Sequence, residues 1–235
     1  MKLLNLLFVI LIALNVSADP GDEAQMAWDK VLKAHVSGAG IVDYAAIKAD
    51  PSFSKAVSLF SNQHPDASWS RNEEMAFWIN VYNVFTVKLI IDNMPLKSIM
   101  DIDKPWDKKI VKLKDKVYSL NQIENEILRP KFKDPRVHFA INCASYSCPK
   151  LANYVIRAES LDATLTKLTK SFLADTNRNK ITTDKAELSQ IFEWFADDFT
   201  AKSDLIGFIN SYAPVQIKQG VKPSFITYSW ALNGK

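Results

Sequence analysis

The sequence predicts a single α+β domain in which a buried central helix packs against a small, mostly antiparallel sheet, with additional helices around it. Helical patterns come first along the chain and a hairpin and separated strands follow, an order typical of α+β folds. The chain has only 6 Gly and no low-complexity linker. Both features favour a single domain that spans residues 19–235. The third observation is a helix that is apolar on every side, as a central helix must be.

The first residues have the features of a signal peptide, which we assign to residues 1–18. Lys2 provides the positive start, an apolar run follows, and Val16-Ser17-Ala18 has the small-x-small form of a cleavage site. No later stretch of the sequence is as long and as continuously apolar as a transmembrane helix. We therefore expect an exported protein, periplasmic or secreted, with no stable membrane span after removal of the signal.

Two amphipathic patterns predict helices over Ala24–His35 and Pro51–Asn62. The next helix, Ser70–Ile91, opens with the S-x-x-E pattern of a capping box, formed by Ser70 and Glu73. Apolar residues cover all of its sides, which is typical of a buried helix in a soluble protein.

Asn80 and Asn83 are the exceptions on that helix and share one face. A buried amide without a hydrogen-bond partner costs about 1–3 kcal/mol, so each must find one. Two interpretations stay open. The amides fix a neighbouring loop or strand, or they act in catalysis by orienting His138 or the substrate.

The rest of the chain reads as a hairpin followed by mixed elements. The hairpin pairs Lys109–Leu113 with Val117–Leu120 around Lys114-Asp115-Lys116. Further helices are expected at Gln122–Arg129, Leu161–Asp175, Leu188–Phe199 and Asp204–Tyr212, and further strands at Val137–Asn142, Lys180–Thr183 and Phe225–Trp230.

The candidate site lies where the strand predicted for Val137–Asn142 gives way to a small-residue loop closed by Pro149. His138 would project from the strand, and Cys143 would follow at its end. A thiolate nucleophile needs a neighbouring base or cation that lowers its pKa, so this pair predicts a catalytic Cys143 with His138 as base.

Three states of the cysteines remain open from the residues alone. Cys143 and Cys148 form a disulfide that closes the loop, or Cys143 is a working thiol, or both are buried free thiols. A metal site built on His138, the cysteines or Asp197-Asp198 lacks a clear fourth ligand, and we expect no metal and no cofactor. Asp197-Asp198 is expected to be solvated.

Composition and motifs exclude several classes of function. The 29 basic and 26 acidic residues nearly balance, so no nucleic-acid partner is expected. The sequence contains no G-x-G-x-x-G, phosphate loop, H-E-x-x-H or G-x-S-x-G motif. Among the possible partners, we therefore expect a small-molecule or peptide ligand, whose identity is unknown.

Several segments together resemble the domain of unknown function 547 family, in the form of an exported bacterial-type member. They are Val42-Asp43-Tyr44, Ala76–Asn83, Ile123–Arg129, Val137–Pro149 and Tyr228–Asn233. The resemblance spans nearly the whole chain after the signal and implies no activity. It points to Tyr82 as a further site position, and it implies that a disulfide is not obligatory in the family, because plant members often have Ser at the position of Cys148.

Two functions follow as hypotheses. The first is a thiol-dependent hydrolase or acyltransferase with Cys143, His138, Asn80 and Asn83 in catalytic roles. The second is a non-catalytic exported binding domain whose site loop is closed by a Cys143–Cys148 disulfide. In either case we expect Tyr82, Ser145 and Tyr146 to contact the ligand.

Overall fold

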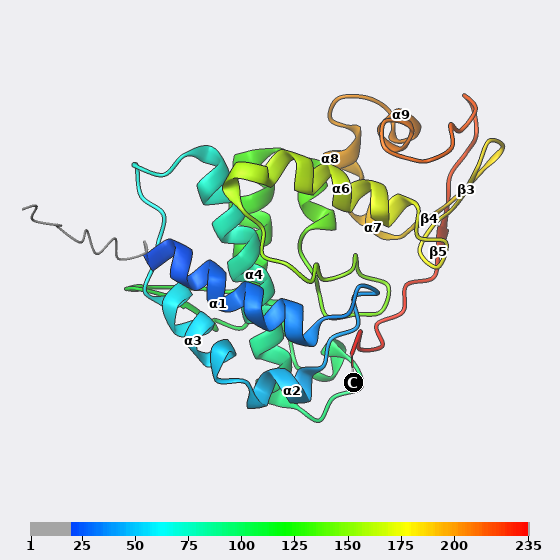
Figure 1. Ribbon diagram of the computed structural model, residues 1–235. Coiled ribbons are helices and arrows are strands. Elements are labelled where there is room, and N and C mark those ends of the chain that lie inside the picture. Colours follow the sequence, from blue (N-terminus) through cyan, green and yellow to red (C-terminus); the bar gives the residue numbers. More distant parts are fainter. Residues whose placement is uncertain (1–19, 235) are drawn as a thin grey trace, which may run out of the picture.

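The computed structural model describes residues 20–234, so the predicted signal peptide lies outside the described residues. The chain forms one α+β domain, as predicted (Figure 1). Helices α1 (Pro20–His35) and α3 (Pro51–Ser61) are close to their predicted bounds, and the short helix α2 (Tyr44–Ala49) between them was not predicted. The central helix α4 (Arg71–Asn93) follows. Helices α1 and α3 lie side by side in front of α4 (Figure 1).

Helix α4 is the centre of the larger hydrophobic core. The predicted capping box is present: the Glu73 N–H donates to Ser70 Oγ at 3.3 Å, and the Ser70 N–H donates to Glu73 Oε2 at 2.7 Å. Among the described residues, α4 alone is long and apolar enough to cross a membrane, and 89% of its apolar window is buried inside the protein. This burial is that of a core helix, whose neighbours are mainly other helices: α2, α3, η3 (Ile123–Phe132) and η5 (Ala158–Ser160).

The segment after α4 contains the predicted hairpin in a shorter form. Strand β1 (Val111–Leu113) pairs antiparallel with β2 (Lys116–Tyr118). The short helices η1 (Ile99–Asp101) and η2 (Pro105–Asp107) precede the hairpin, and α5 (Leu120–Gln122) follows it. A π-helix, η3 (Ile123–Phe132), then replaces the α-helix expected over Gln122–Arg129, and Pro130 lies within it. Such wide turns are rare and often occur at functional sites.

The strand predicted over Val137–Asn142 is wrong, because the chain forms a 3₁₀ helix, η4 (Pro135–Phe139). Asp134 caps this helix by accepting the Arg136 N–H at 3.0 Å, and Pro135 occupies the first position. These start signals outweigh the alternation of apolar residues. All residues from 137 to 142 are buried, so the segment has no separate polar face.

The C-terminal half contributes a three-stranded sheet and the second hydrophobic core. Strand β4 (Lys185–Ser189) pairs antiparallel with β3 (Lys180–Thr182) and parallel with β5 (Ser224–Ile226). The bounds are η5 (Ala158–Ser160), α6 (Leu161–Leu173), β3 (Lys180–Thr182), β4 (Lys185–Ser189), α7 (Ile191–Trp194), α8 (Ala196–Thr200), α9 (Leu205–Asn210) and β5 (Ser224–Ile226). The helix predicted for Leu188–Phe199 is corrected: Leu188 belongs to β4, and the helical part breaks into α7 and α8 at Phe195.

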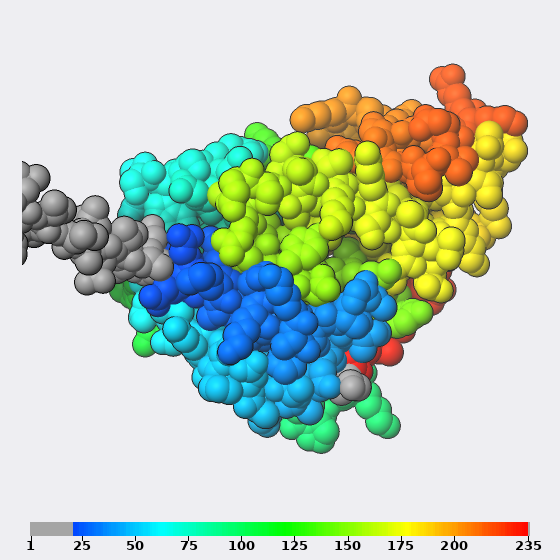
Figure 2. Space-filling view, viewed as in Figure 1, coloured from blue at the N-terminus to red at the C-terminus, as the bar shows by residue number. Residues whose placement is uncertain are grey.

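Residues before α6 join α1 to α4. The Val155 N–H donates to Asp29 Oδ1 on α1 at 3.0 Å, and Ile156 is bound by Asn80 on α4. Figure 2 shows this segment and α6 covering the middle of the visible face next to α1, while the sheet and α9 lie at one side. Leu168 and Trp230 pack against both hydrophobic cores, and Trp230 lines the candidate site.

Candidate functional site

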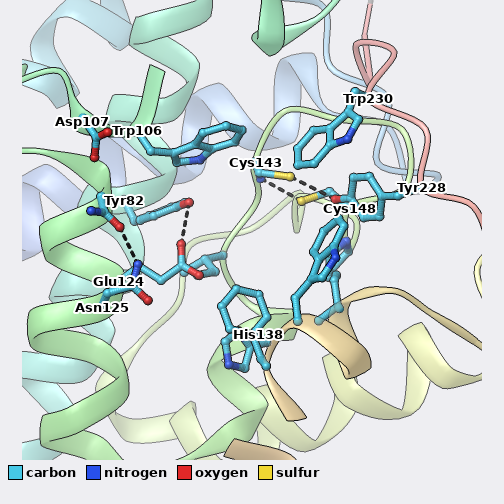
Figure 3. A pocket seen from close by; sticks show the side chains of 16 residues that line it. Tyr82, Trp106, Asp107, Glu124, Asn125, His138, Cys143, Cys148, Tyr228 and Trp230 are labelled. Carbon is cyan, nitrogen blue, oxygen red and sulfur yellow. Dashed lines mark hydrogen bonds between the residues drawn. The ribbon is translucent and has the colours of Figure 1, made fainter. Parts of the chain in front are cut away.

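A pocket of about 430 Å³ opens between the two cores. Its aromatic lining comes from distant parts of the chain: Tyr82, Trp106, Trp194, Phe195, Tyr228 and Trp230. The polar lining includes Asp107, Asn121, Glu124, Asn125, His138, Cys143 and Cys148. Figure 3 shows the Cys143 sulfur on one wall and the Glu124 carboxyl with the Tyr82 hydroxyl on the other, with His138 at the far end.

The loop that carries Cys143 is fixed by two asparagines. Asn83 on α4 accepts the Asn142 N–H at 2.9 Å and donates to the Ala140 carbonyl at 2.9 Å. Asn142 accepts the Ala144 N–H at 2.9 Å and donates to the Pro149 carbonyl at 2.7 Å. Ala144 has a φ of 60°, a conformation that costs energy for a residue with a Cβ. The bonds from Asn142 hold the turn in this conformation, directly beside the Cys143 thiol.

The Cys143 sulfur lies within a cluster of hydroxyl groups. It is 3.1 Å from Ser145 Oγ and 3.2 Å from Tyr228 Oη. Ser145 donates its hydroxyl proton to Tyr228 Oη at 2.9 Å, which leaves the Tyr228 proton free to donate to the sulfur. Burial raises the pKa of Tyr228, so this phenol keeps its proton. Tyr228 therefore suits the stabilisation of a thiolate.

The two thiols differ in their ionisation. Burial opposes the Cys143 thiolate, but hydrogen bonds with Cys148, Ser145 and Tyr228 outweigh it and lower the pKa of Cys143 to about 7. Burial and the neighbouring Cys143 thiolate raise the pKa of Cys148 well above its usual range. Both cysteines are free thiols here, and the Cys143 N–H donates to Cys148 Sγ at 2.8 Å. Cys143 is the half-buried one of the two and the one suited to reaction.

His138 shares the pocket with Cys143 and is held by Asp198. Its Nε2 lies 2.7 Å from Asp198 Oδ2, and the Arg129 Nε–H donates to the same oxygen at 2.6 Å. The imidazole stacks on Phe195 with ring centroids 4.2 Å apart. Burial opposes the Asp198 carboxylate, but hydrogen bonds from His138 and Arg129 lower its pKa to about 2. A carboxylate that is ionised at neutral pH thus orients the imidazole.

The expectation that Asp197-Asp198 is solvated is wrong for Asp198 and holds for Asp197, which is exposed. The two neighbours on α8 point in different directions, so one reaches the site while the other does not. Within the described residues, the hydrogen bonds of the Cys143 side chain go to its own cluster and none goes to His138. A substrate group between them would connect the two.

Glu124 is a site residue that sequence reasoning missed. It lies in the π-helix η3 and accepts a hydrogen bond from the Tyr82 hydroxyl at 3.0 Å. Burial raises the pKa of Glu124, an effect that the nearby His138 partly offsets. The available signal was its place within Ile123–Arg129, one of the segments that carry the family resemblance.

The amides of α4 act as anchors away from the pocket. Asn80 accepts the Ile156 N–H at 3.1 Å and donates to the Ile156 carbonyl at 2.7 Å, which satisfies its amide with backbone. Asn83 binds the Cys143 loop in the same manner. Neither lines the pocket or forms a hydrogen bond with His138, and the side-chain amides of both bind the backbone of neighbouring loops.

The predicted ligand-contact residues have different positions. Tyr82 lines the pocket, and Ser145 is fully buried within the thiol cluster. Tyr146 is 44% exposed, lies outside the pocket and has the Arg178 guanidinium over its ring at 5.4 Å. Among residues 20–234, no group of three or more His, Cys, Asp or Glu side chains could hold a metal ion.

Comparison with known proteins gives one match. The model of a family described as "Protein of unknown function, DUF547" matches residues 67–173. Comparisons with curated proteins and with solved structures gave no match. The matched range contains Tyr82, Glu124, His138 and both cysteines, whereas Asp198 and Tyr228 lie beyond it.

Proposed function

Through residues 67–173 the chain belongs to the DUF547 family of proteins of unknown function, and because that description names no reaction, we propose a function from the site itself. The protein acts as an exported thiol-dependent hydrolase or acyltransferase with Cys143 as its nucleophile. The observation that carries this proposal is the Cys143 sulfur, set beside the Tyr228 and Ser145 hydroxyls at the wall of the pocket.

The chemistry follows from the roles of three side chains. The Cys143 thiolate attacks the carbonyl carbon of an ester, thioester or amide, and a bond forms between sulfur and carbon. The bond to the leaving group breaks, and that group takes a proton from the His138 imidazolium. Water or another acceptor then attacks the thioester, gives its proton to His138 and releases the acyl group. Asp198 keeps the imidazole in place through both steps.

The test uses an activated ester and intact mass. Incubation of the protein with p-nitrophenyl acetate should add one acetyl group to Cys143, detected by mass spectrometry of the intact chain and of its peptides. The Cys143→Ser variant should gain none, while Cys148→Ser should still react. Acetylation on Cys148 or on lysines alone would overturn the assignment of Cys143 as nucleophile.

The pH dependence of labelling is a second readout. Only the thiolate reacts with iodoacetamide, so its rate at Cys143 should rise as the pH increases through about 7 and level off above it. A profile that rises only near the pKa of an ordinary thiol, about 8.5, would contradict an activated Cys143.

A second candidate rests on the contact between the two cysteines. The Cys143 N–H donates to Cys148 Sγ, and the side chains lie within hydrogen-bonding distance. If a disulfide-exchanging oxidant in the export compartment takes two electrons and two protons from them, the bridge closes the loop of a binding domain. Intact mass after alkylation without reductant separates the cases: no added groups supports the bridge, and two added groups support free thiols.

Export is the remaining part of the proposal. The composition of residues 1–18 supports it. Expression of the full chain in a bacterium with a periplasm should yield protein outside the cytoplasm whose first residue is Asp19. Retention of Met1 in a cytoplasmic product would overturn it.

A further inference from the structure

Four rings of the pocket lining, those of Trp106, Trp194, Tyr228 and Trp230, have no Lys or Arg side chain over them among the described residues, whereas Arg129 lies over the Phe195 ring at 4.8 Å. The rings of Trp194 and Trp230 stack 5.7 Å apart, and Tyr228 lies 4.6 Å from Trp230. Trp106 meets Trp230 at a steep angle, with centroids 5.7 Å apart. Among the described residues, the Lys and Arg side chains that lie over rings use other aromatic residues. Figure 3 shows the rings of Trp106, Tyr228 and Trp230 near Cys143, and Trp194 belongs to the same lining.

The charged groups of the same pocket are acidic on the wall opposite the sulfur. Glu124 and Asp107 line it, and the lining includes no Lys or Arg. Within residues 20–234, neither carboxyl belongs to an ion pair. The Tyr82 hydroxyl donates to one oxygen of the Glu124 carboxyl, and the second oxygen has no hydrogen-bond donor among the described residues.

Rings and carboxyls together select one kind of ligand group. Aromatic faces attract cations, and the attraction is strongest when the cation has lost its water. An inorganic ion would need several oxygen ligands in place of rings. An ammonium group whose nitrogen carries alkyl groups suits both walls, because its alkyl groups pack on the rings while its charge faces a carboxylate.

We propose that the pocket beside Cys143 binds an organic cation, an alkylated or quaternary ammonium group, with the tryptophan faces around it and Glu124 as its counter-charge. One further point rests on the proposed function: the substrate of the thiol would then be an ester or amide that carries such a cation. The binding itself does not depend on catalysis.

The test compares two probes of the same shape. Choline carries a trimethylammonium group, and 3,3-dimethylbutan-1-ol has a neutral tert-butyl group in its place. We expect tryptophan fluorescence of the Cys143→Ser protein to report saturable choline binding at least about ten-fold tighter than binding of the alcohol. Glu124→Gln should remove most of this preference. Glu126→Gln should keep it, since Glu126 is exposed on the same π-helix and does not line the pocket.

Several outcomes would overturn the proposal: equal affinity for the two probes, no saturation with choline, an equal loss in the two glutamine variants, or saturable binding of a neutral sugar in place of choline. Alkylation of Cys143 in the wild-type protein, measured across pH, distinguishes failure of the organic-cation proposal from failure of the proposed thiol chemistry. If choline does not bind while Cys143 reacts with its shifted pH profile, only the ligand class is wrong. If choline binds and Cys143 is inert, the pocket is a binding site without the proposed chemistry.

Discussion

At the scale of single residues, the difference between the two cysteines comes from what their sulfurs meet. The Cys143 sulfur receives the Tyr228 hydroxyl, which in turn receives a proton from Ser145. The Cys148 sulfur receives a backbone N–H and is otherwise enclosed. A thiolate gains more from hydroxyl donors than a neutral thiol does, so the arrangement favours ionisation at Cys143.

Removal of the phenol should therefore raise the pKa of Cys143. In Tyr228→Phe the thiolate loses a donor, and alkylation of Cys143 at pH 7 should slow about five-fold, as expected when a pKa of about 7 rises by about one unit, and recover above pH 9. The control is Tyr146→Phe, which removes an exposed phenol from the loop that carries Cys143 and should leave the alkylation rate unchanged. Unchanged labelling in Tyr228→Phe, measured by mass at timed intervals, would remove Tyr228 from the activation of the thiol.

Asp198 gives a prediction for stability against pH. Its pKa is lowered to about 2 by His138 and Arg129, so the folded state favours the carboxylate. A group with a lowered pKa stabilises the fold fully above its unfolded value near 3.9, and this contribution disappears as the pH falls towards 2. Asp198→Asn should thus cost about 1 kcal/mol at pH 7, a figure reduced for partial exposure, and progressively less below pH 4.

Thermal unfolding of Asp198→Asn and of Asp197→Asn at pH 7 and pH 3 checks this. Asp197 is exposed next to Asp198 on α8 and serves as the matched control, expected to change little at either pH. A loss in Asp198→Asn that is the same at both values would show that the charge of Asp198 is not its source.

At the scale of elements, α4 acts as the support of the site although it places only Tyr82 at the pocket. Asn83 satisfies one N–H and one carbonyl of the Cys143 loop, and Asn80 does the same for the segment before η5. Because the helix is buried on all sides, its two asparagines are held in place. The loops therefore cannot shift without leaving buried backbone N–H and carbonyl groups without hydrogen-bond partners.

Asn83→Ala should destabilise the fold by roughly 2–4 kcal/mol, because two buried backbone groups lose their partners. Asn93→Ala, an exposed position in the last turn of the same helix, should change the free energy of unfolding by less than about 0.5 kcal/mol. Urea unfolding measures both. A stable Asn83→Ala protein whose Cys143 no longer reacts would return Asn83 to a catalytic role.

The elements also show where sequence reasoning succeeds. The all-round apolar pattern and the capping box are local, so α4 could be predicted nearly residue by residue. The alternation of Val137, Phe139 and Ile141 was misleading because the intervening residues are buried as well. Asp134 and Pro135 carried the stronger signal for a helix start at that point.

At the scale of the whole molecule, the site is assembled from residues far apart in the sequence. His138 and Cys143 could be predicted from one stretch, but Asp198 follows His138 by 60 residues and Tyr228 follows Cys143 by 85. No local pattern relates such pairs, since packing of the two cores brings them together. Glu124 was not predicted as a site residue for the same reason, because its role depends on a hydrogen bond with Tyr82, 42 residues earlier.

The segment after β5 ties these distant parts together. Asn233 accepts the Tyr44 hydroxyl proton at 2.7 Å, and its backbone N–H donates to the Ala144 carbonyl at 3.0 Å. Gly234 then passes so close to α2 that a Cβ on it would lie 2.3 Å from the Val42 carbonyl oxygen and 2.6 Å from the Tyr44 ring. The segment after β5 can therefore pack against Val42 and Tyr44 only if residue 234 has no side chain.

Gly234→Ala should lower stability by about 1–3 kcal/mol, since the clash involves backbone that cannot move aside easily. Gly38→Ala is the control, because a Cβ there meets no atom within 4 Å. Thermal unfolding compares the two variants. Equal midpoints would mean that the last residues are not seated against α2.

The late position of Tyr228 has a consequence for the order of events during synthesis. A ribosome adds about 5–20 residues per second, so roughly 4–17 seconds pass between the incorporation of Cys143 and that of its phenolic donor. During that interval the growing chain carries a thiol of ordinary acidity, largely protonated at neutral pH and slow to react with electrophiles. The proposed nucleophile is therefore expected to become reactive only once the polypeptide has been extended past Tyr228 and has folded, which would protect the nascent chain from premature acylation.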